Sequence, residues 1–132
     1  MTASKLPTIL IVEDDLENQK FLKIFLKKFF EIEQCDNAED CCTILDTHSI
    51  DIILMDISLK GSKDGLQLTK ELKSHPKFGS LPIIGLSAHA FQKDKDNAYN
   101  AGIDFFMTKP VDAKVLLETL LNTLVEYNKK TK

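Results

Sequence analysis

Acidic side chains follow two of the apolar, strand-like segments of this sequence. Glu13 and Asp14 come directly after the β-branched run Thr8–Val12, and Asp56 closes the apolar run Ile50–Asp56. Carboxylate oxygens are the ligands that a hard cation such as Mg²⁺ prefers, and a carboxylate can also act as a nucleophile that forms an acyl-phosphate. These residue types predict a metal site, a site for phosphoryl transfer, or both.

A hydroxyl group and an ammonium group follow two further segments of the same kind. Ser87 ends the run Leu81–Ser87, and Lys109 follows the run Asp104–Thr108. A serine hydroxyl can donate a hydrogen bond to a phosphoryl oxygen, and a lysine can balance the charge of another. Each residue alone is common where no such chemistry occurs. Acids, a hydroxyl and a lysine at the ends of four strands together indicate a phosphoryl site.

The elements that must position these side chains alternate between strand-like and helix-like patterns. The predicted strands are Thr8–Val12, Ile32–Cys35, Ile50–Asp56, Leu81–Ser87 and Asp104–Thr108. The predicted helices are Leu16–Phe30, a segment from Asn37 to about Asp46, Gly65–Ser74, Lys93–Ala101 and Asp112–Tyr127, with Asp15, Asn37 and Asp64 as caps of the first three. Five βα units predict an α/β fold of the doubly wound class, a three-layer sandwich around a parallel sheet.

In an open parallel sheet, ligands bind beyond the carboxyl ends of the strands, near the point where the strand order reverses. The run Ile50–Asp56 is the most apolar segment, so we expect it to be a central strand beside Thr8–Val12. The acids that follow these two strands would then lie within a few ångströms of one another. Like charges at such distances raise carboxyl pKa values, and a divalent cation relieves the repulsion.

The composition is that of an ordinary globular chain. Its 132 residues are 43% hydrophobic and 28% charged, and we interpret them as a single domain over residues 1–132 with a core from about residue 7 to residue 127. All 17 basic residues are lysines. Because base recognition relies heavily on arginine, we expect no direct contact with nucleic acid. No apolar segment has the length of a signal-peptide core or a membrane span, so we expect a cytoplasmic protein without membrane contact.

The three cysteines, Cys35, Cys41 and Cys42, show no metal-binding spacing. Neighbouring cysteines rarely pair with each other, so we expect all three to pack as small apolar residues. A redox role for Cys41 and Cys42 is the alternative.

Five stretches of the chain, in order and at the right spacing, resemble the receiver domain of bacterial two-component response regulators, in its single-domain CheY-like form. They are Ile9–Asp15, Asp51–Asp56, Asp64–Gly65, Pro82–Ala88 and Phe106–Pro110. The resemblance covers essentially the whole chain. It implies a (βα)5 flavodoxin-like fold with the parallel sheet order 2-1-3-4-5.

The resemblance also implies roles for the acidic residues. Asp56 matches the aspartate that accepts the phosphoryl group, and Asp14 matches a direct ligand of Mg²⁺. Glu13 matches the neighbouring acid that usually reaches the metal through water. Ser58 matches the position whose backbone carbonyl binds the metal.

Three further positions match residues that respond to the phosphoryl group. Ser87 matches the switch hydroxyl, Phe106 matches the aromatic switch residue, and Lys109 matches the lysine that contacts phosphate, in a lysine–proline bond that is often cis in this family. The chain departs from the common pattern at Lys60, where the family often has proline, and in a loop, residues 60–63, that is one residue longer than usual. Phe106 lacks the phenolic hydroxyl often found at its position.

The resemblance implies a stand-alone response regulator that accepts a phosphoryl group on Asp56 with Mg²⁺, from a histidine kinase or a histidine phosphotransfer protein. Because the residues after Pro110 suffice for only one helix, the domain would signal by phosphorylation-dependent contact with a downstream protein target. The candidate docking surfaces lie around Phe21 and around Phe106. We expect a monomer or a weak dimer.

Two alternatives remain open from the sequence alone. A phosphatase of the haloacid dehalogenase type also uses an aspartyl nucleophile, but it carries a second acid where this chain has Ser58. A degenerate receiver would act as a scaffold without phosphorylation. The presence of Asp14, Asp56, Ser87 and Lys109 argues against that alternative.

Overall fold

The computed structural model describes residues 5–59, 61 and 63–131 of the chain. Its five strands form one parallel sheet in the order β2-β1-β3-β4-β5, which confirms the predicted flavodoxin-like topology. The strands are β1 (Thr8–Val12), β2 (Glu31–Cys35), β3 (Ile52–Asp56), β4 (Ile83–Ser87) and β5 (Phe105–Thr108). Lys60 and Ser62, which belong to the loop predicted to be longer than usual, lie outside the described residues.

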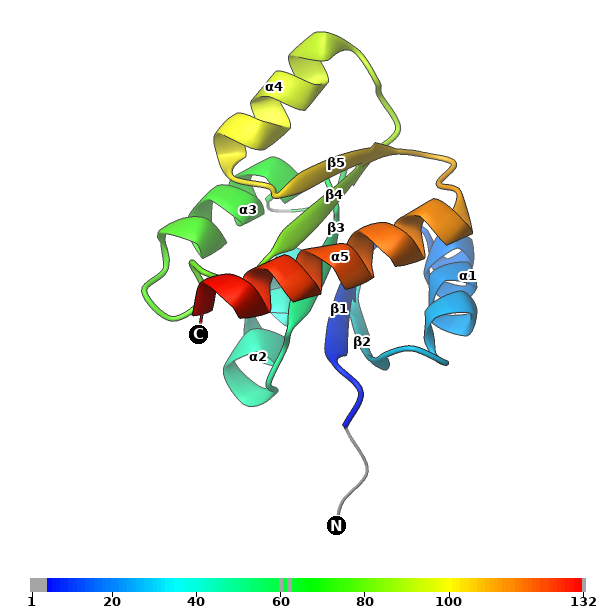
Figure 1. Cartoon of the computed structure of the whole chain (residues 1–132). Coiled ribbons are helices and arrows are strands. Elements are labelled where there is room, and N and C mark those ends of the chain that lie inside the picture. Colours follow the sequence, from blue (N-terminus) through cyan, green and yellow to red (C-terminus); the bar gives the residue numbers. More distant parts are fainter. Residues whose placement is uncertain (1–4, 60, 62, 132) are drawn as a thin grey trace.

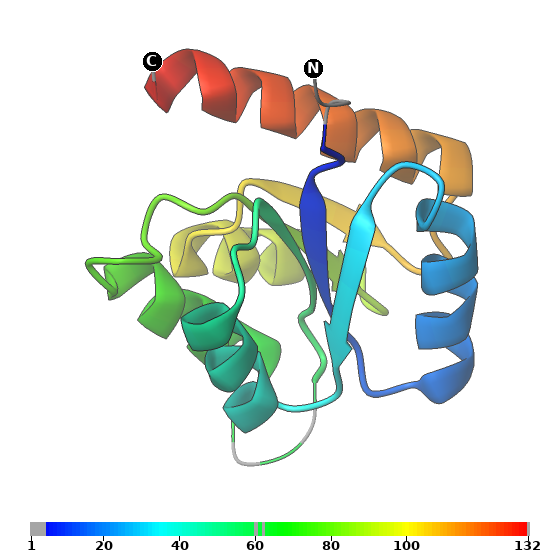
Figure 2. The ribbon, with the colours of Figure 1, turned by 90° about the horizontal axis from the view of Figure 1, so that it is seen from below.

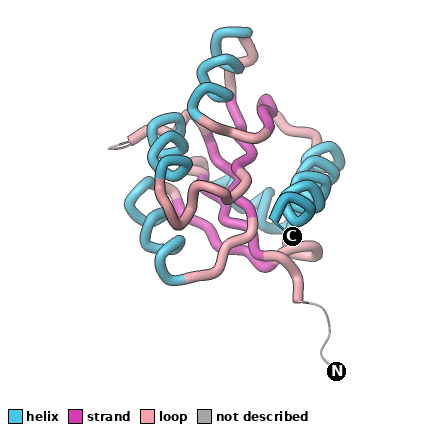
Figure 3. Tube along the Cα trace, turned by 60° about the vertical axis from the view of Figure 1, so that its left-hand side comes forward, coloured by secondary structure: helices cyan, strands magenta, loops and turns pink. Residues whose placement is uncertain are grey.

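Five helices cover both faces of this sheet (Figure 1). They are α1 (Leu16–Leu26), α2 (Ala38–Thr47), α3 (Gly65–Ser74), α4 (Gln92–Ala101) and α5 (Ala113–Thr131). Figure 2 shows α1 and α5 on one side of the strands with α2 and α3 on the other, and in Figure 3 the strands run between the two groups of helices. The chain is therefore the three-layer sandwich that alternating strands and helices predict.

The two faces of the sheet bury two separate apolar clusters, because successive side chains of a strand point to opposite faces. Ile9 and Ile11 pack with α1 and α5, whereas Leu10 and Val12 pack with α2, α3 and α4. β3 and β4 are buried along their whole length, as expected for central strands of a parallel sheet.

Short polar side chains begin the first three helices, as predicted. The Asp15 carboxylate accepts a hydrogen bond from the Glu17 amide, and the Asp64 carboxylate accepts one from the Gln67 amide. The side-chain oxygen of Asn37 caps α2 in the same way. These caps satisfy amide groups that have no partner inside the helix, and they fix where each helix leaves the rim of the sheet.

The first helix ends earlier than predicted. α1 stops at Leu26, and the amides of Phe29 and Phe30 both donate to the Leu26 carbonyl in a tight turn. The turn buries Phe30, which is 1% exposed, and leaves Phe29 37% exposed. The tight turn before β2 therefore places Phe30, and not Phe29, in the core.

The other differences are small. α5 continues to Thr131, beyond the predicted end at Tyr127, through a stretch that contains neither glycine nor proline. The prediction that all three cysteines pack inside was wrong for Cys42. Cys35 and Cys41 are buried, but Cys42 lies on the exposed side of α2.

Candidate functional site

Glu13 and Asp56 meet at the carboxyl end of the sheet because β1 and β3 are adjacent. Val12 pairs with Met55 in the sheet register, so the residues that follow them come side by side. Their carboxyl groups are almost fully enclosed, with Glu13 1% and Asp56 2% exposed. Buried acids are rare in proteins unless they are paired or bind a metal. This pair therefore marks the carboxyl end of the sheet as the candidate site.

Asp14 completes an acidic cluster with these two residues. Carboxylate oxygens of Glu13, Asp14 and Asp56 all lie within 4.8 Å of one another. β1 lies at the point where the strand order reverses, with β2 on one side and β3 on the other, and ligands of doubly wound folds bind there. The donor set consists of hard oxygen atoms, which fits Mg²⁺ and does not fit a soft metal.

Lys109 provides the positive charge in this cluster. Its Nζ atom lies 3.0 Å from Oε1 of Glu13 and 3.3 Å from Oδ2 of Asp56. The backbone positions it from two directions, because its amide donates to the Ser87 carbonyl at the end of β4 and its bond to Pro110 is cis. Two buried carboxylates thus share one ammonium group, with a third carboxylate beside them.

The hydrogen bonds and charges around the two buried acids separate their pKa values. Burial raises the pKa of Asp56 to about 7, and the nearby Glu13 adds to this increase while Lys109 opposes it. Burial also acts to raise the pKa of Glu13, but hydrogen bonds with Asp56, the Asp15 amide, Lys109 and Asn18 together lower it. Burial and Glu13 thus favour the protonated form of Asp56, whereas the hydrogen bonds around Glu13 favour its ionised form.

The same carboxylates also raise the pKa of Lys109. Burial by itself would lower that pKa, but the hydrogen bond to Glu13 and the charges of both acids outweigh burial. The lysine therefore stays protonated and can balance negative charge at the site.

Backbone geometry at the end of β3 holds Asp56 in place. The Ser58 amide donates to Oδ1 of Asp56 over 2.9 Å, which leaves Oδ2 toward Lys109. α3 begins very close to this turn, because a Cβ atom on Gly65 would overlap with the backbone oxygen of Asp56. Only glycine fits at this position without moving the residue that carries the reactive carboxylate.

Ser87 ends β4 and Phe106 lies on β5, and each has a hydrogen-bond partner outside the acidic cluster. Both are buried, and the Ser87 hydroxyl oxygen accepts a hydrogen bond from the His89 amide at 3.0 Å. The Phe106 amide donates to the phenolic oxygen of Tyr99 on α4. Among the described residues, these hydrogen bonds lead away from the acidic cluster.

Sequence reasoning missed Gln19 and Tyr99. Gln19 is buried on α1, where its side-chain amide donates to the backbone carbonyls of Glu13 and Cys35 and so ties the end of β1 to the end of β2. A signal existed for it, because Gln19 shares the buried stripe of Leu22 and Leu26 although it is polar. Nothing in the sequence indicates that Tyr99 accepts a hydrogen bond from β5.

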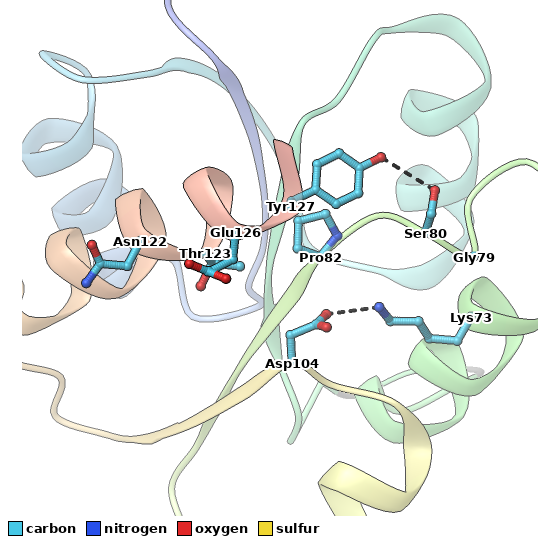
Figure 4. Close-up of a pocket in the computed structure, with 9 residues that line it drawn as sticks. All are labelled: Lys73, Gly79, Ser80, Pro82, Asp104, Asn122, Thr123, Glu126 and Tyr127. Carbon is cyan, nitrogen blue, oxygen red and sulfur yellow. Dashed lines mark hydrogen bonds and ion pairs between the residues drawn. The ribbon is translucent and has the colours of Figure 1, made fainter. Parts of the chain in front are cut away.

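A second hollow lies at the opposite end of the sheet, where β4 and β5 begin. This cavity of about 470 Å³ is lined by Lys73, Asp104 and Tyr127 among others. Figure 4 shows the ammonium of Lys73 directed at the carboxylate of Asp104, at a distance of 2.9 Å. Lys73 and Asp104 form a one-to-one pair here, and Glu126 also lines the cavity. Among the described residues, the close group of three acids lies at the other end of the sheet.

A family model described as the response regulator receiver domain matches residues 9–121. The chain belongs to this family. Receiver domains are phospho-accepting signalling domains and not conventional enzymes, and the pocket of Glu13, Asp14 and Asp56 is typical of their phospho-accepting site.

Relatives and solved structures agree with this assignment. The chain is 33% identical over 122 residues to the heme response regulator HssR of Staphylococcus saprophyticus, which covers 92% of this chain and 53% of HssR. This receiver domain thus spans about half the length of that relative. It is also similar to a CheY-like receiver domain protein from Methanospirillum hungatei, with 27% identity, a TM-score of 0.85 and coverage of 96% of this chain and 99% of that one.

A second similar structure contains a metal. The receiver domain of a sensor histidine kinase from Pseudomonas aeruginosa has a magnesium ion coordinated in its active-site cleft. It is 28% identical to this receiver domain, with a TM-score of 0.82, and the match covers 90% of this chain and 98% of that one.

Among the described residues of the present chain, no helix combines the length and the apolar character needed to cross a membrane.

Proposed function

We propose that this receiver domain accepts a phosphoryl group on Asp56 from a phosphohistidine of a histidine kinase or a histidine phosphotransfer protein. The observation that carries the proposal is the arrangement of Asp56, which shares a buried cluster with Glu13 and Asp14 and lies 3.3 Å from Lys109. An oxygen of the Asp56 carboxylate would attack phosphorus. The phosphorus–nitrogen bond of the donor would break, and its electron pair would return to the imidazole ring.

Carboxylates of Glu13, Asp14 and Asp56 and the backbone carbonyl of Ser58 would hold Mg²⁺. Without a cation the pKa of Asp56 is about 7, so in many protein molecules this carboxyl group is protonated at neutral pH. A protonated carboxyl group is a poor nucleophile. Bound Mg²⁺ would supply positive charge that favours the ionised carboxylate and offsets the phosphoryl oxygens. The ammonium of Lys109 would remain against a phosphoryl oxygen and balance its charge.

Ser87 and Phe106 would convert the modification into a change of surface. The Ser87 hydroxyl would leave the His89 amide and donate to a phosphoryl oxygen, and Phe106 would change its packing as Ser87 moves. The phosphoryl group can shift the two states only through contacts that differ between them. The downstream target would recognise the altered surface around Phe106 by protein–protein contact.

The donor protein would dock near the start of α1. This helix begins next to the acidic cluster, and its apolar side chains Leu16, Phe21 and Ile24 are exposed to solvent. Exposed aromatic and aliphatic groups beside a reactive residue favour contact with another protein.

The test is labelling with a radioactive acyl-phosphate in the presence of Mg²⁺. We expect one acid-stable, base-labile phosphoryl group per chain, and we expect Asp56→Asn to abolish it because an amide cannot form the mixed anhydride. Asp104→Asn, a matched change at the other end of the sheet, should label normally. Undiminished labelling of Asp56→Asn would refute the proposal, and repeated turnover of phosphoesters would instead support the phosphatase alternative.

A further inference from the structure

The first turn of α1 lies against Glu13, the buried acid that follows β1. The side-chain nitrogen of Asn18 donates a hydrogen bond to Oε1 of Glu13 at 2.5 Å. Lys109 Nζ lies 3.0 Å from the same oxygen, and the Asp15 amide donates to the other oxygen, Oε2, at 3.1 Å. Both oxygens of this carboxylate are therefore held by donors that belong to the chain itself.

Asn18 reaches Glu13 in a way that its place in the helix does not require. It is the third residue of α1, where a glutamate or glutamine side chain often reaches back to the amide of the cap residue. Here the amide of the cap residue Asp15 donates to Glu13, and the Asn18 side chain passes the cap to reach the same carboxylate. The Asp15 carboxylate accepts a hydrogen bond from the Asn18 amide at 3.4 Å, so the three residues form a closed ring of hydrogen bonds.

The next residue of α1 holds the backbone of Glu13. The side chain of Gln19 donates to the Glu13 carbonyl at 3.1 Å and to the Cys35 carbonyl at 3.2 Å. The Glu13 amide donates to the same Cys35 carbonyl at 3.0 Å. With its backbone and both carboxylate oxygens held, the buried Glu13 side chain has little freedom to turn within the acidic cluster.

We propose that Asn18 is a positioning residue that makes the acidic cluster prefer Mg²⁺ over the larger Ca²⁺. The inference rests on the Mg²⁺ site of the proposed function. Mg²⁺ demands a nearly ideal octahedral set of oxygen ligands, whereas Ca²⁺ accepts about six to eight oxygens in a flexible arrangement and often takes both oxygens of one carboxylate. A carboxylate whose two oxygens are each held by a donor cannot readily turn to offer both of them to one ion.

Loss of the Asn18 amide would leave Oε1 of Glu13 with Lys109 as its one remaining recorded partner among the described residues. The carboxylate could then turn more freely. This freedom disfavours the ion that needs strict geometry and has a smaller effect on the ion that adapts to its ligands. Groups that orient a metal ligand typically change metal affinity by about 10- to 100-fold.

The test compares the full chain with Asn18→Leu, which keeps a similar side-chain volume and removes the amide donor. Dissociation constants for MgCl₂ and for CaCl₂ are measured separately, by NMR titration of isotopically labelled protein at fixed pH and ionic strength. We expect the constant for Mg²⁺ to rise about tenfold and the constant for Ca²⁺ to change by less than about threefold. The preference for Mg²⁺ over Ca²⁺ should therefore fall by about threefold or more.

A second variant and a matched control accompany this measurement, with thermal unfolding in the absence of metal to verify each fold. Asn18→Ala, which favours the helix, should lose the same preference. Asn122→Ala changes an exposed asparagine of α5 that lines the cavity at the opposite end of the sheet, and it should leave both dissociation constants unchanged.

The ratio of the two dissociation constants separates positioning from a merely structural role. If Asn18 only stabilised the start of α1, both variants would weaken Mg²⁺ and Ca²⁺ by the same factor, and the inference would be overturned. Tighter binding of Mg²⁺ by Asn18→Leu would overturn it as well. Failure of the unmodified chain to bind Mg²⁺ would refute the proposed metal site together with the inference, whereas Mg²⁺ binding with an unchanged ratio in the variants would refute the inference alone.

Discussion

The two ends of the sheet each bring a lysine to an aspartate, but their charge balance differs. At the amino end, Lys73 contacts Asp104 at 2.9 Å and also donates to the Leu81 carbonyl. The Asp104 carboxylate accepts a further hydrogen bond from the Ile83 amide. One positive group meets one negative group, both reach solvent, and the pair clips α3 to the starts of β4 and β5 (Figure 4).

At the carboxyl end, the single ammonium of Lys109 serves both Glu13 and Asp56, and Asp14 lies beside them. Burial of this excess negative charge costs stability unless a cation or a proton compensates it. The comparison shows that an ion pair by itself does not mark a functional site. What distinguishes the acidic end is that its buried carboxylates outnumber the ammonium groups that contact them.

The largest effect should come from removing the lysine at the acidic end. We expect Lys109→Met to slow phosphoryl acceptance by Asp56 roughly 100-fold, because a charged donor aimed at the phosphoryl oxygens is lost. The rate is measured by labelling at saturating Mg²⁺, with thermal unfolding to verify the fold. A rate within a factor of two or so of the unmodified protein would remove Lys109 from the phosphoryl site.

The same substitution type should have opposite effects on stability at the two ends. A carboxyl group whose pKa rises on folding contributes stability that is complete below its unfolded pKa and is lost as the pH rises through its folded pKa. For Asp56 this loss spans the interval from 3.8 to about 7. Asp56→Asn cannot ionise, so without metal it should be more stable than the unmodified protein at pH 8, by on the order of 2 kcal/mol, and about equal to it near pH 4.

Asp104→Asn is the matched control for that measurement. It weakens the contact with Lys73 and the hydrogen bond from the Ile83 amide, so it should lower stability by about 1 kcal/mol at pH 8. Urea unfolding with a chelator present measures both variants. If Asp56→Asn were also destabilising at pH 8, the buried negative charge of the acidic cluster would not reduce the stability of the fold.

The acidic end could be predicted from the sequence because its charged residues stand directly at the ends of recognisable strands. Glu13, Asp14, Asp56 and Lys109 each follow an apolar run, and parallel topology brings such positions to one edge. The caps Asp15, Asn37 and Asp64 were equally readable, because capping depends on near neighbours in the chain.

The features that the sequence did not reveal depend on packing between distant segments. The Gln19 side chain links the ends of β1 and β2, and the Tyr99 hydroxyl contacts β5 from α4. Periodicity also could not decide which of Phe29 and Phe30 enters the core, since a tight turn after Leu26 determines it.

Added Mg²⁺ should raise the free energy of unfolding by binding the acidic cluster, and it should have no effect through the Lys73–Asp104 pair. At pH 8 and a Mg²⁺ concentration ten times its dissociation constant, we expect the unmodified protein and Lys73→Met to gain about 1.4 kcal/mol. Asp14→Asn should gain much less because it loses one of the carboxylates. Potassium chloride at equal ionic strength is the control for screening. An equal gain in potassium chloride would show a general salt effect and no metal site.

The smallest effect should come from removing the lysine at the balanced end. Lys73→Met removes the ammonium group and keeps the aliphatic part of the side chain. That part packs closely against Gly102, because a Cβ atom on Gly102 would lie only 2.8 Å from Lys73 Cγ. Because the ion pair with Asp104 is partly exposed, its loss should cost about 1 kcal/mol in urea unfolding. Phosphoryl acceptance by Asp56 should stay at the rate of the unmodified protein, since the clip shares no residue with the acidic cluster. If Lys73→Met instead slowed labelling as much as Lys109→Met, the two ends would be coupled through β4 and β5, and the separation between a structural and a reactive end would be wrong.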